Sequence, residues 1–410
     1  FMRAEVVIIC SFAVAILLFL SNFKLCGVVG AVLRGVQLGI FGIVVLLYDL
    51  INQVFPMNKV IGLIIFSIVI YRYVRRLCVV KKNIVILVIA GALMFISFLQ
   101  AEDFGFAFTE SIYWLNTLLL VLLLTDEKEN KILYDALKHS KIFLRIICII
   151  GNFILAVCLL LPVCYNDNWG GRFFVCFSSS NHVLACGCCL LLALSLFVTK
   201  EIKSNIISVA FMFVPTYAVL QSGSRIYLLS IMAIWYVFYA YCLKNKQLKM
   251  VWLPIAGVLG VYVFINSGIY VKMINPSMYG DLVGMAKITN GRSDFWLIDL
   301  TQYVRSPLFK LFLGGGFDYS SRLNLKFYNM YIWAHNDYIE NLLSVGIVGI
   351  IIYLSSIKKI WNTLIKKQTF IMTCAVFFYC VVVGFMNGFF PYQHYLYSFI
   401  IIYTLVSACG

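Results

Sequence analysis

Charged residues are scarce in this sequence. Asp, Glu, Lys and Arg make up 12% of the 410 residues, whereas soluble globular proteins contain about 25%. Hydrophobic residues make up 63%, and the mean hydropathy is +0.96. This shortage of charge excludes an ordinary soluble domain and indicates a protein embedded in a membrane.

The apolar residues lie in long runs that recur along the chain. A helix of about 17–25 apolar residues crosses roughly 30 Å of hydrocarbon. Because lipid offers no hydrogen bonds to the backbone, such runs must be helical. We therefore predict an all-α integral membrane protein, a polytopic bundle of about 12–13 transmembrane helices forming one domain over residues 1–410. The runs are 5–20, 27–48, 60–74, 83–99, 111–124, 142–163, 181–199, 204–220, 225–243, 249–266, 336–357, 369–388 and 393–408.

Acidic residues are outnumbered by basic ones, 17 to 32, which gives a net charge of +15. In a soluble chain this excess would suggest nucleic acid, but here short basic loops predict the cytoplasmic side of the membrane. The expected partner is therefore the lipid bilayer and not a nucleic acid. These loops are 71–82, 200–204, 244–249 and 358–367.

Counting spans outward from the basic loops places four polar segments on the external face. Three are short, at residues 100–110, 165–180 and 221–225, and the fourth is a long loop over residues 267–335. The orientation is consistent from residue 60 onward. Near the N-terminus, Lys24 and Arg34 leave open whether the protein has twelve spans or thirteen.

Motifs for metals and nucleotides are absent. No Cys/His spacing resembles a metal site, and the glycines of "FLGGGFDYSSR" lack the Lys-Ser/Thr that completes a phosphate loop. We expect no metal and no cofactor. Most of the 14 cysteines lie inside apolar runs and act as small hydrophobes. Cys164 and Cys176 flank an external loop and would form a disulfide only in an oxidising compartment.

The long loop contains more positive charge than membrane insertion requires. Clustered Arg and Lys bind phosphate through charge and paired hydrogen bonds, so this excess suggests an anionic ligand. Its cationic residues are Lys272, Lys287, Arg292, Arg305, Lys310, Arg322 and Lys326.

Within this loop, residues 293–305 have the spacing of an amphipathic helix. Ser293 is the predicted N-cap, and Pro307 ends the helix. The pattern predicts a helix in the plane of the membrane surface. One face is expected to carry Trp296, Leu297, Leu300, Tyr303 and Val304, and the other Asp294, Asp299, Gln302 and Arg305.

Candidate functional residues come from four polar clusters on the predicted external face. Helix capping explains Asn181 and Asn336 equally well, but it does not explain the arginines or the histidine. An imidazole titrates near neutral pH and can take a proton from a hydroxyl group. The candidates are Arg172 with Asn181, Arg225, Arg292, and His335 with Asn336.

These residue types suit a lipid-linked diphosphate donor. Its tail would partition into the bilayer, and arginines would stabilise the diphosphate as it leaves. Such a donor is already activated, so no nucleotide is needed on the external face. The histidine would act as the base for an incoming hydroxyl group.

Five motifs, in order over roughly residues 170–355, resemble the bacterial O-antigen polymerase and O-antigen ligase superfamily, membrane glycosyltransferases of the GT-C type. The resemblance implies that Arg225 and Arg292 bind undecaprenyl diphosphate, and that His335 activates the acceptor. Arg172 has a looser match, because this chain has Cys176-Phe177 and Ser180-Asn181 where family members often have Gly and Pro-Asn. The motifs are "RFFVCFSSSN", "SGSR", "GRSDFW", "SPLFKLFLGGGFD" and "HNDYIENLLSVGIVG".

The resemblance favours a polymerase of undecaprenyl-diphosphate-linked repeat units in the bacterial inner membrane, with its site on the periplasmic face. Its partners would be the lipid-linked donor and acceptor glycans and a chain-length regulator protein. One alternative is a ligase, which transfers the same glycan to the lipid A core. Another is a transporter of lipid-linked sugars, although transporters place ionisable residues near the middle of the membrane.

Overall fold

The computed structural model is almost entirely helical. It describes residues 73, 77–139, 141–168, 171–176, 178, 180–201, 205–243, 245–274, 284–289, 291–386, 388 and 392–409. Within these residues, the sheet structure consists of one antiparallel pair, in which Tyr165 lies opposite Phe174 and Asp167 opposite Arg172. The prediction of an all-α architecture is therefore confirmed at the level of fold class.

Each predicted apolar run within the described residues forms a helix. Runs 5–20 and 27–48 lie outside the described residues, as does run 60–74 except for Tyr73. The matching helices are α5 (Leu77–Gln100), α6 (Phe104–Leu124), α8 (Lys141–Leu160), α9 (Asn181–Glu201), α10 (Asn205–Gln221), α11 (Tyr227–Tyr241), α12 (Lys246–Ile265), α18 (Asp337–Ile365), α19 (Phe370–Met386) and α20 (Gln393–Cys409).

Five helices in the described part of the chain are long and apolar enough to cross a membrane, or six if one bent pair is a single span. The bent pair is Glu127–His139 with Leu144–Leu160, inclined at 71°. Helices α10, α11, α19 and α20 are apolar but shorter. The five are Asn83–Gln100, Phe104–Leu124, Asn181–Lys200, Lys246–Ile265 and Asp337–Ile365.

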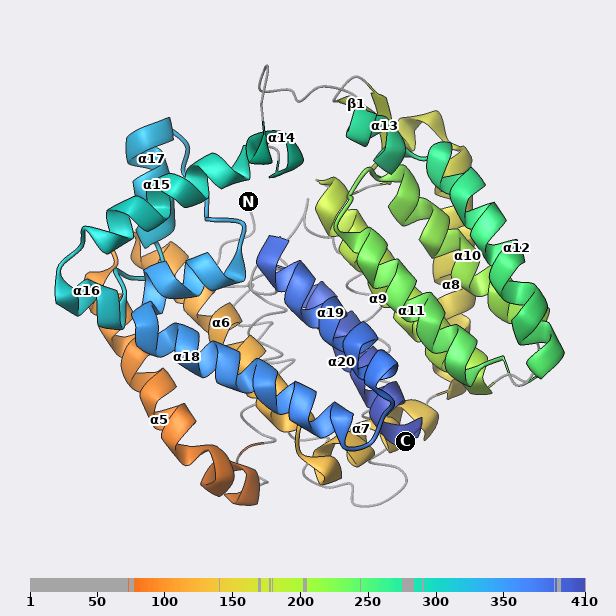
Figure 1. Ribbon diagram of the computed structural model, residues 1–410, viewed down its shortest axis with the longest axis horizontal. Helices are drawn as coiled ribbons and strands as arrows, with labels where there is room; N and C mark the ends of the chain where they lie inside the picture. Colours follow the sequence, from red (N-terminus) through yellow and green to blue (C-terminus); the bar gives the residue numbers. More distant parts are fainter. Residues whose placement is uncertain are drawn as a thin grey trace, which may run out of the picture.

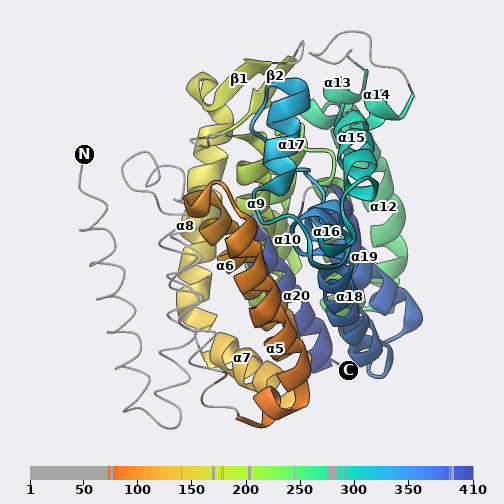
Figure 2. The same cartoon turned by 90° about the vertical axis from the view of Figure 1, so that its left-hand side faces the viewer.

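The remaining elements are short and join the long helices. Most of them lie together at one end of the helical body, which we call the loop end, and α7 lies at the opposite end (Figure 2). They are α7 (Glu127–His139), η1 (Pro162–Cys164), β1 (Tyr165–Asn168), β2 (Gly171–Phe174), α13 (Gly268–Ile274), α14 (Met285–Thr289), α15 (Arg292–Val304), α16 (Leu308–Leu313) and α17 (Tyr319–Tyr328).

The body has two sides with α19 and α20 between them (Figure 1). Helices α8 to α12 form one side, and α5, α6 and α15 to α18 form the other. Helix α9 packs against α8, α10, α11 and α20, and Cys186, Leu191 and Leu196 along it are fully buried. Hydrophobic burial against several neighbours makes α9 the centre of the core.

Helix α12 is apolar yet faces outward. Met250 and Val258 are each 72% exposed, and Tyr262 is 67% exposed. A soluble protein rarely leaves so large an apolar patch in water. Lipid is the medium that suits this surface, so the structure supports a membrane-embedded protein.

Helix α18 contains a break at Gly346, which has φ 68° and ψ −166°. A Cβ at Gly346 would lie 2.4 Å from the Phe312 carbonyl, and one at Gly314 would lie 2.2 Å from the Ser344 oxygen. The backbone amide of Gly315 donates to the Leu343 oxygen at 2.8 Å. The glycines thus permit the end of α16 to pack directly against the α18 backbone.

The predicted surface helix exists, but its cap and its faces were predicted wrongly. Helix α15 begins at Arg292 after Gly291, which has φ 79°, and Ser293 is not the cap. Asp299 is fully buried with Trp296 and Tyr303, while Leu297 and Val304 are about 70% exposed. Trp296 and Tyr303 face inward because they pack in one hydrophobic cluster with Ile339 and Leu343 of α18, a partner that the periodicity of α15 alone does not identify.

Cys164 and Cys176 are free thiols in the structure. The backbone amide of Cys176 donates to the Cys164 oxygen at 3.0 Å. Cys164 and Cys176 are therefore joined by a backbone hydrogen bond and not by the disulfide that we considered.

Candidate functional site

Three of the predicted site residues converge at the loop end. Arg225 lies in the turn between α10 and α11, Arg292 is the first residue of α15, and His335 immediately precedes the cap of α18. All three lie near enough to the imidazole of His182, in the first turn of α9, to act on it electrostatically. Lys272 of α13 belongs to the same group.

The turn that carries Arg225 is held from several directions. Gly223 has φ 72°, and a Cβ there would lie 2.6 Å from the Phe173 ring. Gly268 approaches the same turn, because its Cβ would lie 2.5 Å from the Gln221 oxygen. The Asn181 side chain donates from Nδ2 to the Ser222 oxygen at 2.6 Å. Asn181 therefore fixes the Arg225 turn to the start of α9, and its side-chain nitrogen donates to the protein backbone.

Lys272 was not among the site residues predicted from the sequence. Its stem lies against Gly223, and its ammonium is 5.9 Å from the centre of the Phe173 ring. Burial, with the charges of Arg225 and Arg292, lowers the pKa of Lys272 to about 8. The signal in the sequence was the basic excess of residues 267–335, but this excess does not show which lysine turns inward.

Arg292 is the most enclosed of the cations. Burial lowers its pKa, Arg225 adds to this effect, and Tyr392 and Tyr227 oppose it. Burial also lowers the pKa of Arg225. Like charges held together in a poorly solvated space destabilise one another, and an arginine at a helix N-terminus is unfavourable as well. An anionic ligand would relieve both costs.

Arg172 does not join this group. It lies on β2, is exposed, and donates from Nη2 to the Pro162 oxygen at 2.9 Å. Its guanidinium also lies 5.1 Å from the centre of the Tyr165 ring. Successive residues of a strand point to opposite faces, and Phe173 is the neighbour that contacts the Arg225 turn. Arg172 accordingly points the other way.

His335 adopts an unusual backbone conformation, with φ 53°. Its ring lies 4.5 Å from that of Trp333, and within the described part of the chain its buried Nδ1 has no hydrogen-bond partner. Burial, together with the charge of Arg292, lowers its pKa well below 6.5. The imidazole is therefore neutral at pH 7 and able to accept a proton.

Asn336 caps α18. Its Oδ1 accepts hydrogen bonds from the backbone amides of Tyr338 at 3.0 Å and Ile339 at 3.3 Å. This is the ordinary N-cap role, and it fixes the direction in which the chain leaves His335. The structure thus places Asn336 beside the site as a cap.

A group of buried acidic residues lies behind His335. Burial and the nearby charge of Glu340 raise the pKa of Asp299 to about 8, and Asn324 opposes the shift. Glu340 accepts hydrogen bonds from Ser320, Ser344 and the amide of Ala334. Sequence reasoning assigned these residues no role. In the part of the chain that the structure describes, no three His, Cys, Asp or Glu side chains are placed to hold a metal.

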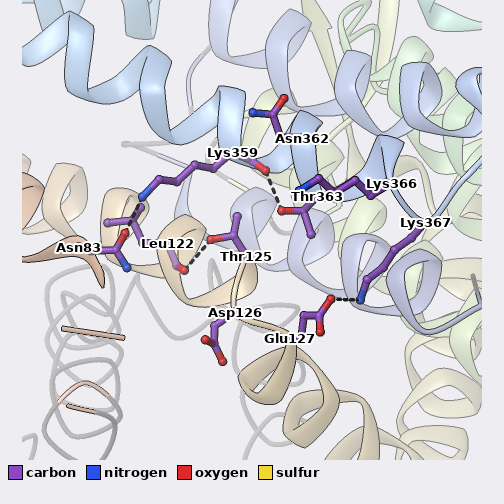
Figure 3. Close-up of a pocket in the computed structure, with 10 residues that line it drawn as sticks. All are labelled: Asn83, Leu122, Thr125, Asp126, Glu127, Lys359, Asn362, Thr363, Lys366 and Lys367. Carbon is purple, nitrogen blue, oxygen red and sulfur yellow. Dashed lines mark hydrogen bonds and ion pairs between the residues drawn. The ribbon is translucent and has the colours of Figure 1, made fainter. Parts of the chain in front are cut away.

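A separate cavity of about 350 Å³ lies between α5, α6, α7 and the end of α18 (Figure 3). Lys359 donates to Asn83 at 2.5 Å, and Lys367 pairs with Glu127 at 2.9 Å. Both lysines belong to the basic segment 358–367, which lies with α7 at the end opposite the loop end, so this cavity lies away from the His335 cluster.

Comparison with protein-family models and with curated proteins gave no match to this chain.

Proposed function

We propose that the protein is a membrane glycosyltransferase that acts on lipid-diphosphate-linked glycans. The observation that supports this most directly is the convergence of Arg225, Lys272 and Arg292 beside the neutral imidazole of His335. The cations suit a diphosphate, and the imidazole suits proton removal from a hydroxyl group.

The proposed reaction is a single displacement. His335 takes the proton from an acceptor hydroxyl as its oxygen bonds to the anomeric carbon of the donor sugar. The bond from that carbon to the diphosphate oxygen breaks, and the lipid diphosphate leaves with the electron pair. Attack from the opposite face inverts the anomeric centre. Arg225, Lys272 and Arg292 stabilise the negative charge on the leaving group.

Among glycosyltransferases, we propose a polymerase of undecaprenyl-diphosphate-linked repeat units with a GT-C architecture of 12 or 13 spans. The support is the order of the five motifs, three of which supply Arg225, Arg292 and His335. The site is proposed to open to the external face of the bacterial inner membrane, because the short basic loops lie at the other end.

The test is reconstitution in lipid vesicles with purified lipid-linked repeat units as the sole substrate. Growth of a glycan ladder on a gel without lipid A core supports the polymerase. Transfer that requires lipid A core indicates the ligase. Movement of the substrate across the vesicle membrane with no new glycosidic bond would overturn the enzyme proposal in favour of a transporter.

A further inference from the structure

The residue before His335 is held by two side chains from different helices. Ala334 is fully buried. Its carbonyl accepts a hydrogen bond from Trp296 Nε1 of α15 at 2.7 Å, and its amide donates to Glu340 Oε2 of α18 at 3.0 Å. The backbone carbonyl and amide of Ala334 are therefore both hydrogen-bonded to side chains and not to the backbone of a helix or strand.

These bonds bear directly on His335. A positive φ is uncommon for a residue with a Cβ, so the surrounding contacts must hold the chain in this conformation. Ala334 is fixed on one side of His335, and the Asn336 cap fixes the other. The imidazole thus projects from a segment that is restrained at both ends.

Glu340 is itself fixed. Ser320 Oγ lies 2.8 Å from both of its carboxylate oxygens, and Ser344 Oγ donates to Oε1 at 3.1 Å. Trp296 lies one helical turn after Arg292 on α15. The hydrogen-bonded backbone of the helix fixes the spacing between these two residues. The same helix therefore carries a cation of the cluster and the indole that holds the histidine segment.

We infer that Trp296 and Glu340 are positioning residues, which hold the His335 imidazole beside the Arg225, Lys272 and Arg292 cluster through their bonds to Ala334. This inference rests on the proposed function for its catalytic consequence. Neither residue is expected to touch the substrate.

Trp296→Phe tests the inference, because it removes the indole N–H and keeps an aromatic ring. Small displacements of a catalytic group can cost up to about 100-fold in rate, and we expect kcat to fall about 10-fold with little change in KM for the lipid-linked donor. The matched control is Trp235→Phe, which removes the bond from Trp235 Nε1 to Thr216 Oγ1 at 3.0 Å in a different helix pair. The control should retain near-normal kcat.

Glu340→Leu is the second variant. Leucine is of similar size but has no acceptor, so the Ala334 amide loses the hydrogen bond that it donates to Oε2. It too should lower kcat and not KM. Combining either change with His335→Gln should cause no further loss, because residues that act through one group are not additive. Full additivity would show that both changes act by general destabilisation and would overturn the inference.

A readout independent of turnover separates this inference from the proposed function. Diethyl pyrocarbonate modifies accessible imidazoles, and mass spectrometry reports each site. Trp296→Phe should speed modification at His335 and leave exposed His139 unchanged. Unchanged reactivity at His335 would overturn the positioning role of Trp296 even if His335→Gln is inactive. Faster modification with normal turnover would support that positioning role and overturn the role of His335 as a base.

Discussion

His335 combines a strained backbone, a buried ring and a cationic neighbour. Helix capping accounts for Asn336 but not for this histidine, because a cap needs only a short side-chain acceptor. Burial and Arg292 both disfavour the imidazolium, and so the side chain can accept a proton at a pH where a solvent-exposed histidine is partly charged.

His335→Gln is predicted to lose about 10²–10⁴ in turnover, the usual contribution of a positioned base. The amide keeps hydrogen-bonding capacity but cannot take a proton at neutral pH. Donor binding should persist, as measured with purified protein and labelled lipid-linked donor. Near-normal glycan ladders from the Gln variant would remove the assignment of His335 as the base.

The pH profile provides a second check on His335. The acid form is inactive, and the lowered pKa moves its formation below pH 6.5. We therefore expect kcat/KM, which reports the free enzyme, to stay constant as the pH falls to 6.5 and to decline only at lower pH. A decline centred at or above pH 6.5 would contradict the buried, neutral imidazole.

Lys272 should cause the pH profile of kcat/KM to fall on its basic side. With a pKa of about 8, it is charged below that pH and neutral above it, so donor affinity should fall as the pH rises through this value. The effect belongs in kcat/KM, which reports the free enzyme, more than in kcat. Lys272→Arg stays charged and should remove this fall, whereas Lys272→Gln should bind donor weakly throughout. Arg172→Ala is the comparison and should leave the fall in place.

At the scale of elements, α15 and α18 are arranged by what they meet. Helix α15 turns Trp296, Asp299 and Tyr303 inward toward the start of α18, and it leaves Leu297, Leu300 and Val304 exposed. Helix α18 bends at Gly346 to receive the end of α16. These two contacts set the position of Arg292 relative to His335.

Gly346→Ala is predicted to destabilise the protein by about 2–4 kcal/mol, because it combines a positive φ with overpacking against backbone. The measurement is the thermal unfolding midpoint in detergent or nanodiscs. Gly257→Ala in α12 is the control, since nothing lies within 4 Å of its Cβ. Equal midpoints for the two variants would show that the α16–α18 contact is not tight.

On the scale of the whole molecule, the candidate site and the basic segments lie at opposite ends of the helical body. Helices α13 and α15, which carry Lys272 and Arg292, lie at the loop end, and α7 with the C-terminal end of α20 lies at the other (Figure 2). This separation matches the alternation of loops that the sequence predicts, while the compartment that each end faces remains a prediction.

Cysteine labelling tests that orientation. Lys326→Cys places a thiol at an exposed position of the loop end, and Lys366→Cys places one at an exposed position of the opposite end, near α7. An impermeant maleimide should label the first in intact spheroplasts and the second only after lysis. The unsubstituted protein controls for native cysteines. The reverse pattern would place the cluster in the cytoplasm and overturn the proposed external site.

Much of the helical architecture could be predicted from local sequence. An apolar run long enough for lipid has no alternative to a helix, because unpaired backbone groups are too costly there. Every such run within the described residues is helical. The predicted basic loops are shorter than expected, because α18 continues to Ile365 and α12 begins at Lys246. Arg225, Arg292 and His335 were identifiable because membrane insertion did not require them.

Tertiary packing decided which polar residues meet. Lys272 turns inward because Gly223 and Phe173 leave room for its stem, while strand alternation turns Arg172 away. Asp299 is buried because the face of α15 that carries it packs against α17 and α18. The sequence alone determined the helices and the types of residue available for chemistry, since both follow from local composition. Only the folded structure decided the site, because its groups come from segments more than 150 residues apart, from His182 to His335.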